Sequence, residues 1–213
     1  MKRFGSTKII LLVILLLGLF FRIYKLEIFY PWGHDQDLFS MIVKDIVINH
    51  HFRLIGQQTT IIGVFIGPLF YYLMGLFLML FNMNPLSGTI PITIIALLTI
   101  FSFYWVFSKF FGNRVGLIGA FFYAVSPGMV FFSRWAVPTQ PTTLWSVWYL
   151  YALFSILKGD RPLILISVLV GLIWHIHVAL VPLFLLLPVS FWLSKKTGHK
   201  IGISKKSIAI SFL

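Results

Sequence analysis

The sequence predicts an all-α fold, a polytopic membrane helix bundle with a large first outer loop that carries juxtamembrane helices. Of its 213 residues, 59% are hydrophobic and 10% are charged, whereas soluble domains carry about 25% charged residues. Apolar runs such as IILLVILLLGLFF and ILISVLVGLIW lack an amphipathic period. A helix that is apolar all round is buried in lipid or in a large core, and this chain is too short for several large cores.

Six hydrophobic segments divide the chain, and they lie near residues 9–24, 61–82, 90–108, 115–132, 143–157 and 163–193. The first could be a cleaved signal peptide. However, Arg22 and Tyr24 follow its apolar run, where a cleavage site would have small residues. We therefore interpret it as a retained membrane helix.

The last segment, residues 163–193, is too long for one crossing. As a single helix its 31 residues would extend about 46 Å, against a hydrocarbon core of about 30 Å. The stretch WHIHVALVP interrupts it, and Pro182 and Pro188 limit continuous helix. We expect two helices, with His175 and His177 near the turn between them.

The basic residues predict how these segments cross the membrane. If residues 61–82 dip into the membrane or lie along its surface, 12 of the 17 Lys and Arg residues share the side of the N-terminus. If residues 61–82 cross the membrane fully and 163–193 cross twice, only four Lys and Arg residues share the side of the N-terminus. If 61–82 cross fully and 163–193 cross once, nine do. Because Lys and Arg concentrate on the cytoplasmic side, the first arrangement is favoured, and Gly63 and Pro68 suit a bent segment. We therefore expect residues 25–88 to form the outer loop, with amphipathic and re-entrant or interfacial segments.

Composition also excludes several functions. The chain has no cysteine, so it has no disulfide, thiol nucleophile or cysteine metal site. Its net charge of +12 raises the question of nucleic acid, but no basic patch is large and interleaved with aromatic residues. We expect no nucleic-acid partner, and a multi-pass protein of the plasma membrane whose site faces outward.

Four of the five acidic residues fall in this outer region, and two of them open a predicted helix within PWGHDQDLFSMIVKDIV, residues 31–47. Pro31 and Gly33 break the chain before it. Apolar residues then recur at the helical spacing i, i+3, i+4, i+7 and i+8, at Phe39, Ile42, Val43, Ile46 and Val47. The pattern predicts an amphipathic helix on the membrane surface.

Asp35 and Asp37 are the candidate catalytic residues. Asp35 stands at the helix start, where a carboxylate either caps free N–H groups or acts as a general base at the interface. A divalent metal at Asp35 and Asp37 is possible, since carboxylates offer oxygen ligands. Two carboxylates specify a metal poorly, so the sequence assigns no metal ligands and no certain cofactor, and a divalent metal at this pair stays an open alternative.

A second set of candidates would bind the phosphate of a donor or another part of a substrate, and consists of His50, His51, Arg53, Arg134, Gln140, His175 and His177. A planar guanidinium suits phosphate recognition. The alternative for Arg53 and Arg134 is interfacial anchoring or snorkelling. On a helix, His175 and His177 would point about 200° apart, which favours a hydrogen bond or plain packing over a metal.

Taken in order, these motifs resemble the GT-C superfamily of polyprenyl-phosphate-dependent glycosyltransferases, and most closely its protein O-mannosyltransferase and aminoarabinose-transferase branch. DQDLF at residues 35–39 takes the place of that branch's Asp-Glu-x-x-Tyr-type motif. LIGQQT at 54–59, GPLFYYL at 67–73 and the proline-rich end of 110–141 are similar to its later landmarks. The likeness covers most of the chain as scattered landmarks.

The resemblance implies a membrane enzyme that moves a sugar from a polyprenyl-phosphate donor to a hydroxyl on a protein, lipid or glycan. Asp35 matches the family's catalytic aspartate and would be the general base. Gln36 replaces the usual Glu, and Gln140 stands where some members have Asp before Pro. Asp37 therefore takes the second carboxylate role, or that role is absent. Because the family is longer, we expect residues 1–213 to be a single membrane module truncated at its C-terminus.

Two other classes of protein would use the same residues differently. In a membrane transporter or lipid flippase, Asp35, Arg134 and His175 would line a pathway, and a third possibility is a non-catalytic scaffold. A transporter more often has ionisable residues in mid-helix or a repeated bundle. Here the polar groups collect at one outer edge, which favours chemistry at the interface.

Overall fold

The computed structural model describes residues 2–197. Its elements are α1 (Lys2–Ile23), α2 (Leu26–Phe29), α3 (His34–Asn49), α4 (Leu69–Leu80), η1 (Pro85–Gly88), α5 (Thr89–Phe111), α6 (Asn113–Val125), α7 (Pro127–Phe132), α8 (Thr142–Leu157), α9 (Leu163–Ile176), η2 (Val178–Leu185) and α10 (Leu186–Lys196). This part of the chain has no strand, and an isolated bridge joins Gln58 to Phe65. The all-α prediction is confirmed.

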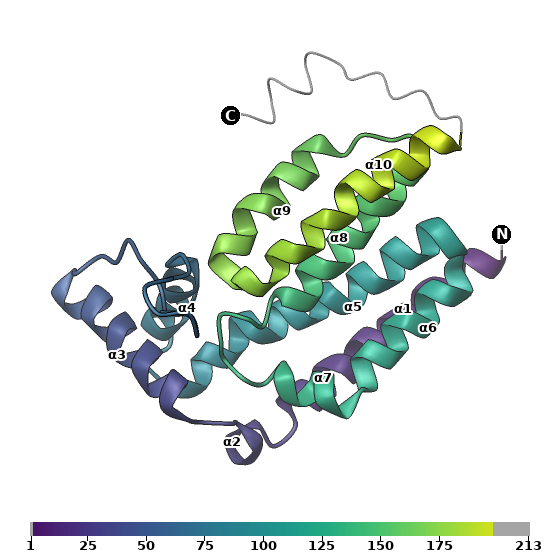
Figure 1. The fold of residues 1–213 in the computed structure, drawn as a ribbon. Helices are drawn as coiled ribbons and strands as arrows, with labels where there is room; N and C mark the ends of the chain where they lie inside the picture. Colours follow the sequence, from purple (N-terminus) through teal and green to yellow (C-terminus); the bar gives the residue numbers. More distant parts are fainter. Residues whose placement is uncertain (1, 198–213) are drawn as a thin grey trace.

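The bundle consists of helices α1, α5, α6, α8, α9 and α10 (Figure 1). Helix α5 packs against α1, α6 and α8, and α8 packs against α9 and α10. Successive bundle helices run in alternating directions. The start of α1, the α5–α6 turn, the α8–α9 turn and the end of α10 therefore lie together at what we call the basic end, which includes Lys8, Arg114, Lys158, Lys195 and Lys196.

The lengths and the surface of the helices suit a membrane. Among the described residues 2–197, three stretches are long and apolar enough to cross one, Ser6–Ile23, Pro85–Phe111 and Val178–Lys196. Helix α5 has 23 residues and extends about 34 Å. The side chains of Leu12 and Val13 on α1 are more than half exposed, as lipid-facing residues are. The chain is an integral membrane protein.

Helices α3 and α4 lie at the opposite end of the bundle, which we call the site end (Figure 1). They pack against each other because α3 is amphipathic, as predicted. Phe39, Val43 and Ile46 are buried, and Phe39 contacts the rings of Phe70 and Tyr71 on α4. This small core fixes α3, and with it the candidate site, to the bundle.

Residues 61–82 do not form one helix, which confirms the expected bend. Residues 56–67 turn back on themselves, with the Gly56 N–H donating to the Ile66 carbonyl at 2.8 Å. Gly63 lies in this turn with a φ of 81°, a value that glycine adopts without strain. Helix α4 then has only 12 residues, about 18 Å, which is shorter than the hydrocarbon core of about 30 Å. That this segment does not cross stays a prediction.

Two other segments are also divided. Residues 163–193 form α9, the 3-10 helix η2 and α10, and His177 is the extended residue between the first two, as predicted. Residues 115–132 divide at Ser126 into α6 and α7, because Pro127 begins a new helix there. The turn after α7 brings residues 133–141 over the site end.

Candidate active site

Asp35 lies in the first turn of α3, but the helix start is held by its neighbour. The Gly33 N–H donates to Gln36 Oε1 at 2.9 Å, and Gln36 Nε2 donates to the Ala136 carbonyl at 3.1 Å. The expected capping role of Asp35 therefore belongs to Gln36, which is 2% exposed. The Gln36 amide both accepts and donates here, whereas an ionised Glu could only accept, which accounts for Gln36 where the resemblance led us to expect Glu.

Asp35 is among the lining residues of two pockets. The first, of about 220 Å³, is lined by Asp35, Gln57, Gln58, Thr59, Thr60, Ile66, Trp135, Val137, Pro138, Thr139, Ile176, His177 and Val178. The second, of about 260 Å³, is lined by Pro31, Trp32, Gly33, His34, Asp35, Gln36, Phe131 and Trp135. Asp35 and Trp135 line both. Gln57 Nε2 donates to Asp35 Oδ1 at 3.4 Å, a long hydrogen bond.

Asp37 does not share this position. Its Oδ1 accepts a hydrogen bond from Trp32 Nε1 at 2.8 Å, and it lines neither of the two pockets. Asp35 and Asp37 thus have different partners. Within residues 2–197, no group of three or more His, Asp or Glu side chains is placed to hold a metal ion.

The far end of α3 collects a separate polar cluster around Asp45. This carboxylate accepts from Asn49 at 2.9 Å and from Arg53 at 2.9 Å, and lies 3.1 Å from His51 Nδ1. The Asn49 hydrogen bond, followed by His51 and Arg53, lowers the pKa of Asp45. His50 has a left-handed backbone with φ 56° and turns the chain back over α3. His50, His51 and Arg53 are therefore not brought to the Asp35 pockets.

Arg134 binds the end of α1. Its Nη2 donates to the carbonyls of Phe21 and Tyr24, the latter at 2.9 Å, and its guanidinium lies 5.6 Å from the ring centre of Phe29. Burial lowers the pKa of Arg134, although a guanidinium remains charged in proteins. Its buried Nε has no hydrogen-bond partner. In the sequence, Arg134 lies between Phe131 and Trp135, which both line the second pocket, but Arg134 itself does not line it.

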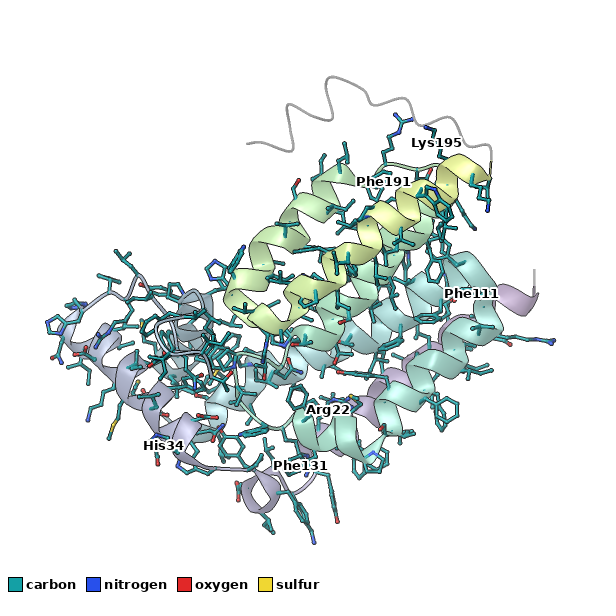
Figure 2. The ribbon with its side chains drawn as sticks, in the orientation of Figure 1. Arg22, His34, Phe111, Phe131, Phe191 and Lys195 are labelled. Carbon is teal, nitrogen blue, oxygen red and sulfur yellow. The ribbon has the colours of Figure 1, made fainter. Side chains whose placement is uncertain are left out.

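Arg22 is a second arginine at this end, and sequence reasoning did not select it. It is fully buried, and its Nη1 donates to the carbonyls of Gly18 at 2.9 Å and Ala124 at 3.1 Å. The Ala124 carbonyl lies just before the break between α6 and α7, so Arg22 ties α1 to that break. In the view of Figure 2, Arg22 lies toward the end of the bundle where Phe131 is labelled, and far from Lys195. The signal in the sequence that could have singled out Arg22 is that an ionisable residue at the end of a membrane helix is a functional candidate.

The two histidines of the H-x-H pair have different surroundings. His177 lines the first pocket, and its Nδ1 accepts from the Ala179 N–H at 3.0 Å. The neutral ring therefore carries its proton on Nε2 and can donate from there. His175 packs against Gly67, where an added Cβ would lie 2.1 Å from Nδ1. Gln140 is 1% exposed and lines neither pocket, and its Oε1 has no partner.

Of the predicted residues, the structure thus places only Asp35 and His177 at the first pocket. Sequence reasoning missed Gln57, Thr139 and Trp135, which complete it. Gln57 and Thr139 are uncharged, and Trp135 is one of many aromatic residues in the chain. None of the three therefore stood out as a candidate in the sequence. Their role follows from the turn at 56–67 and from the loop at 133–141.

The fold and the site define an α-helical integral membrane protein whose polar side chains gather at one end of the bundle. Residues 66–211 match the family of dolichyl-phosphate-mannose-protein mannosyltransferases. Because this is more than half of the chain, the chain belongs to that family, and is a membrane glycosyltransferase of the GT-C type. The match includes Arg134, Gln140 and His177 and begins after Asp35. No curated protein and no solved structure matches the chain.

Proposed function

We propose that this protein transfers a mannosyl group from a polyprenyl-phosphate donor to a hydroxyl acceptor on the non-cytoplasmic face of the plasma membrane, with Asp35 as general base. The family supports the reaction class. The observation that carries the role of Asp35 is its position on the shared wall of two pockets. A general base has to reach the acceptor hydroxyl, and a carboxylate on the wall between an acceptor pocket and a donor pocket would take that proton beside the anomeric carbon.

The reaction is a single displacement at the anomeric carbon. The acceptor oxygen attacks that carbon and gives its proton to Asp35, while the bond from the carbon to the phosphate oxygen breaks. The bonding electrons leave with the polyprenyl phosphate, which departs as an anion. The Gln57 amide holds one carboxylate oxygen and leaves the other for the acceptor hydroxyl.

The two pockets suit different substrates. The first has hydroxyl and amide side chains from Thr59, Thr139 and Gln58, and the free Nε2–H of His177, which fit a polar acceptor or the sugar. The second has the aromatic side chains of Trp32, Phe131 and Trp135. We assign the phosphate of the donor to the second pocket. Arg134, whose Nε has no hydrogen-bond partner, directly precedes the pocket residue Trp135 in the sequence. Neither Asp37 nor a metal has a step in this mechanism.

A transfer assay tests the reaction directly. The protein in lipid vesicles is given polyprenyl-phosphate-mannose labelled in the sugar, or the same sugar on a nucleotide diphosphate, together with hydroxyl acceptors. We expect label in the acceptor and equal release of polyprenyl phosphate with the lipid donor alone. Movement of the lipid-linked sugar across the bilayer without release of polyprenyl phosphate would instead establish the transporter or flippase alternative.

A labelling experiment tests the side of the membrane on which the site lies. Because the chain has no cysteine, His50→Cys and Pro85→Cys each introduce a single thiol. Both positions lie at the site end, before and after the segment that we expect not to cross. A membrane-impermeant thiol reagent should label both in intact cells. Labelling of position 85 only after permeabilisation would show that residues 61–82 cross.

A further inference from the structure

The hairpin formed by residues 56–67 has an apolar tip. Its turn is closed by the Val64 N–H, which donates to the Ile61 carbonyl at 3.1 Å. Such turns are usually built from Gly, Asn, Asp, Pro and Ser. Here Ile61 and Ile62 occupy the turn, and they are 60% and 91% exposed. The hairpin therefore ends in a hydrophobic projection that the rest of the described chain does not cover.

The stem of the same hairpin is hydrogen-bonded and lines the first pocket. The Gly56 N–H donates to the Ile66 carbonyl at 2.8 Å, and the Ile66 N–H donates to the Gln57 carbonyl at 3.0 Å. The Thr59 N–H donates to the Val64 carbonyl at 2.8 Å. Gln57, Thr59 and Ile66 are among the lining residues of the first pocket. Whatever holds the tip in place therefore also holds one wall of that pocket.

The base of the hairpin is fixed to the site end of the bundle. The Gly67 N–H donates to the Trp174 carbonyl at 2.6 Å, in the last turn of α9. The Trp174 side chain is more than half exposed, and tryptophan is enriched where membrane helices meet the membrane–water interface. Three residues of chain span at most about 11 Å, so Val64 lies within about 11 Å of Gly67. The tip is therefore within reach of the interface that Trp174 marks.

The charge pattern of the sequence indicates what covers the tip. The second half of α3 and the loop after it are rich in charge, with Lys44, Asp45, His51 and Arg53. No charged residue and no histidine occurs in residues 54–88, where a soluble chain of that length would carry about nine charged residues. A loop surrounded by water would be more polar than this. The boundary between lipid headgroups and acyl chains accepts exposed apolar side chains without any paired charge.

We propose that the tip at Ile61 and Ile62 inserts into the membrane leaflet at the site end, so that the bilayer itself supports the stem wall of the first pocket. The insertion is shallow, because irregular backbone does not face lipid within the hydrocarbon core. Apolar faces that lie in the interface are buried about 5–10 Å deep, at the boundary of headgroups and acyl chains. This contact does not depend on which reaction the pocket carries out.

Depth-dependent fluorescence quenching tests the insertion. Because the chain has no cysteine, Ile62→Cys introduces a single thiol for an environment-sensitive fluorophore. The labelled protein is placed in phosphatidylcholine vesicles that carry a spin label near either the headgroup end or the methyl end of an acyl chain. We expect blue-shifted emission and stronger quenching by the label near the headgroups. His51→Cys, in the charged loop before the hairpin, is the matched control and should be quenched by neither label.

Three results of this experiment would overturn the proposal. Absence of quenching at position 62 would place the tip in water or against another protein. Stronger quenching by the label near the methyl end would place the tip in the hydrocarbon core. Equal quenching at positions 51 and 62 would mean that the apolar tip is not what draws the chain into the leaflet.

Hydrogen exchange in vesicles tests the support of the pocket wall without a fluorophore. Ile61→Ser with Ile62→Ser removes the apolar tip, and exchange of the Thr59 and Ile66 amides in the stem should become faster by about tenfold or more, since burial of one large apolar side chain contributes at least that factor. Met41→Ser removes another exposed apolar side chain at the site end, on α3 and outside the hairpin, and should leave stem exchange as in the parent. Unchanged exchange in the tip variant, or equal acceleration in Met41→Ser, would contradict the link between the tip and the pocket wall.

Discussion

Asp35 and Asp45 lie at opposite ends of α3, and their carboxylates are held in opposite ways. Asp45 accepts hydrogen bonds from Asn49 and Arg53 and lies beside His51. Asp35, ten residues and about 15 Å away along the helix, receives one long hydrogen bond from Gln57 and faces two pockets. An acid whose oxygens are all engaged locally holds a loop in place. An acid with a free oxygen at a pocket is available for proton transfer.

The same contrast separates the arginines at this end of the molecule. Arg53 is paired with Asp45, so its charge is already neutralised. Arg134 and Arg22 donate to backbone carbonyls and have no carboxylate partner among residues 2–197. The sequence alone does not distinguish these three arginines. Their hydrogen-bond partners do, because an arginine that is not paired with a carboxylate keeps a net positive charge that can attract a phosphate.

The largest expected effect is at Asp35. General-base catalysis contributes about 10²–10⁴-fold, so Asp35→Asn should lower the transfer rate by that factor while membrane insertion is unchanged. Asp45→Asn is the matched control on the same helix and should transfer at the parent rate. Asp37→Asn keeps an oxygen for Trp32 and should have a much milder effect than Asp35→Asn. A parent-like rate for Asp35→Asn would remove the proposed base.

The next effect in size concerns the donor. A hydrogen bond to a charged group contributes about 1.5–3 kcal/mol, so Arg134→Ala should raise the KM for the polyprenyl-phosphate donor by about tenfold or more. Arg53→Ala loses only an exposed ion pair, which contributes about 0–1 kcal/mol, and should leave the donor KM unchanged. The opposite ranking of these two variants would place the donor phosphate at the far end of α3.

A smaller effect is expected from Gln57. Gln57→Ala removes the hydrogen bond that orients Asp35, and because that bond is long we expect kcat to fall by about tenfold at most. Gln58→Ala changes the neighbouring residue of the same pocket wall, without a bond to Asp35, and serves as the control. Equal losses in the two variants would mean that they act through the shape of the pocket and not through Asp35.

Much of the fold could be predicted because it depends on periodicity and length. The buried face of α3, with Phe39, Val43 and Ile46, follows the helical spacing in the sequence. Residues 163–193 had to divide because one helix of that length exceeds the membrane. Such rules act within one segment and need no knowledge of its partners.

The partners of the candidate residues could not be predicted in this way. His51 and Arg53 contact Asp45 because His50 adopts a left-handed backbone, and nothing periodic marks that turn. Gln57 contacts Asp35 across 22 residues of chain, through the bend at 56–67. Sequence reasoning therefore selected Asp35 as a candidate, which stays a prediction, but grouped with it basic residues that contact Asp45.

The smallest effect tests Asp45 by acidification. Hydrogen bonds from Asn49 and Arg53, together with the nearby His51, lower the pKa of Asp45. A carboxyl with a lowered folded-state pKa stabilises the folded structure above its unfolded pKa of about 3.9 and loses that contribution as the pH falls through the folded value. Hydrogen exchange of residues 50–53 should therefore remain slow at neutral pH and become faster, after correction for intrinsic exchange, when the pH falls below about 4. In Asp45→Asn this acid-induced change should disappear, whereas Asp35→Asn should retain it. If both variants lose it, the ends of α3 are coupled and the contrast between the two aspartates does not hold.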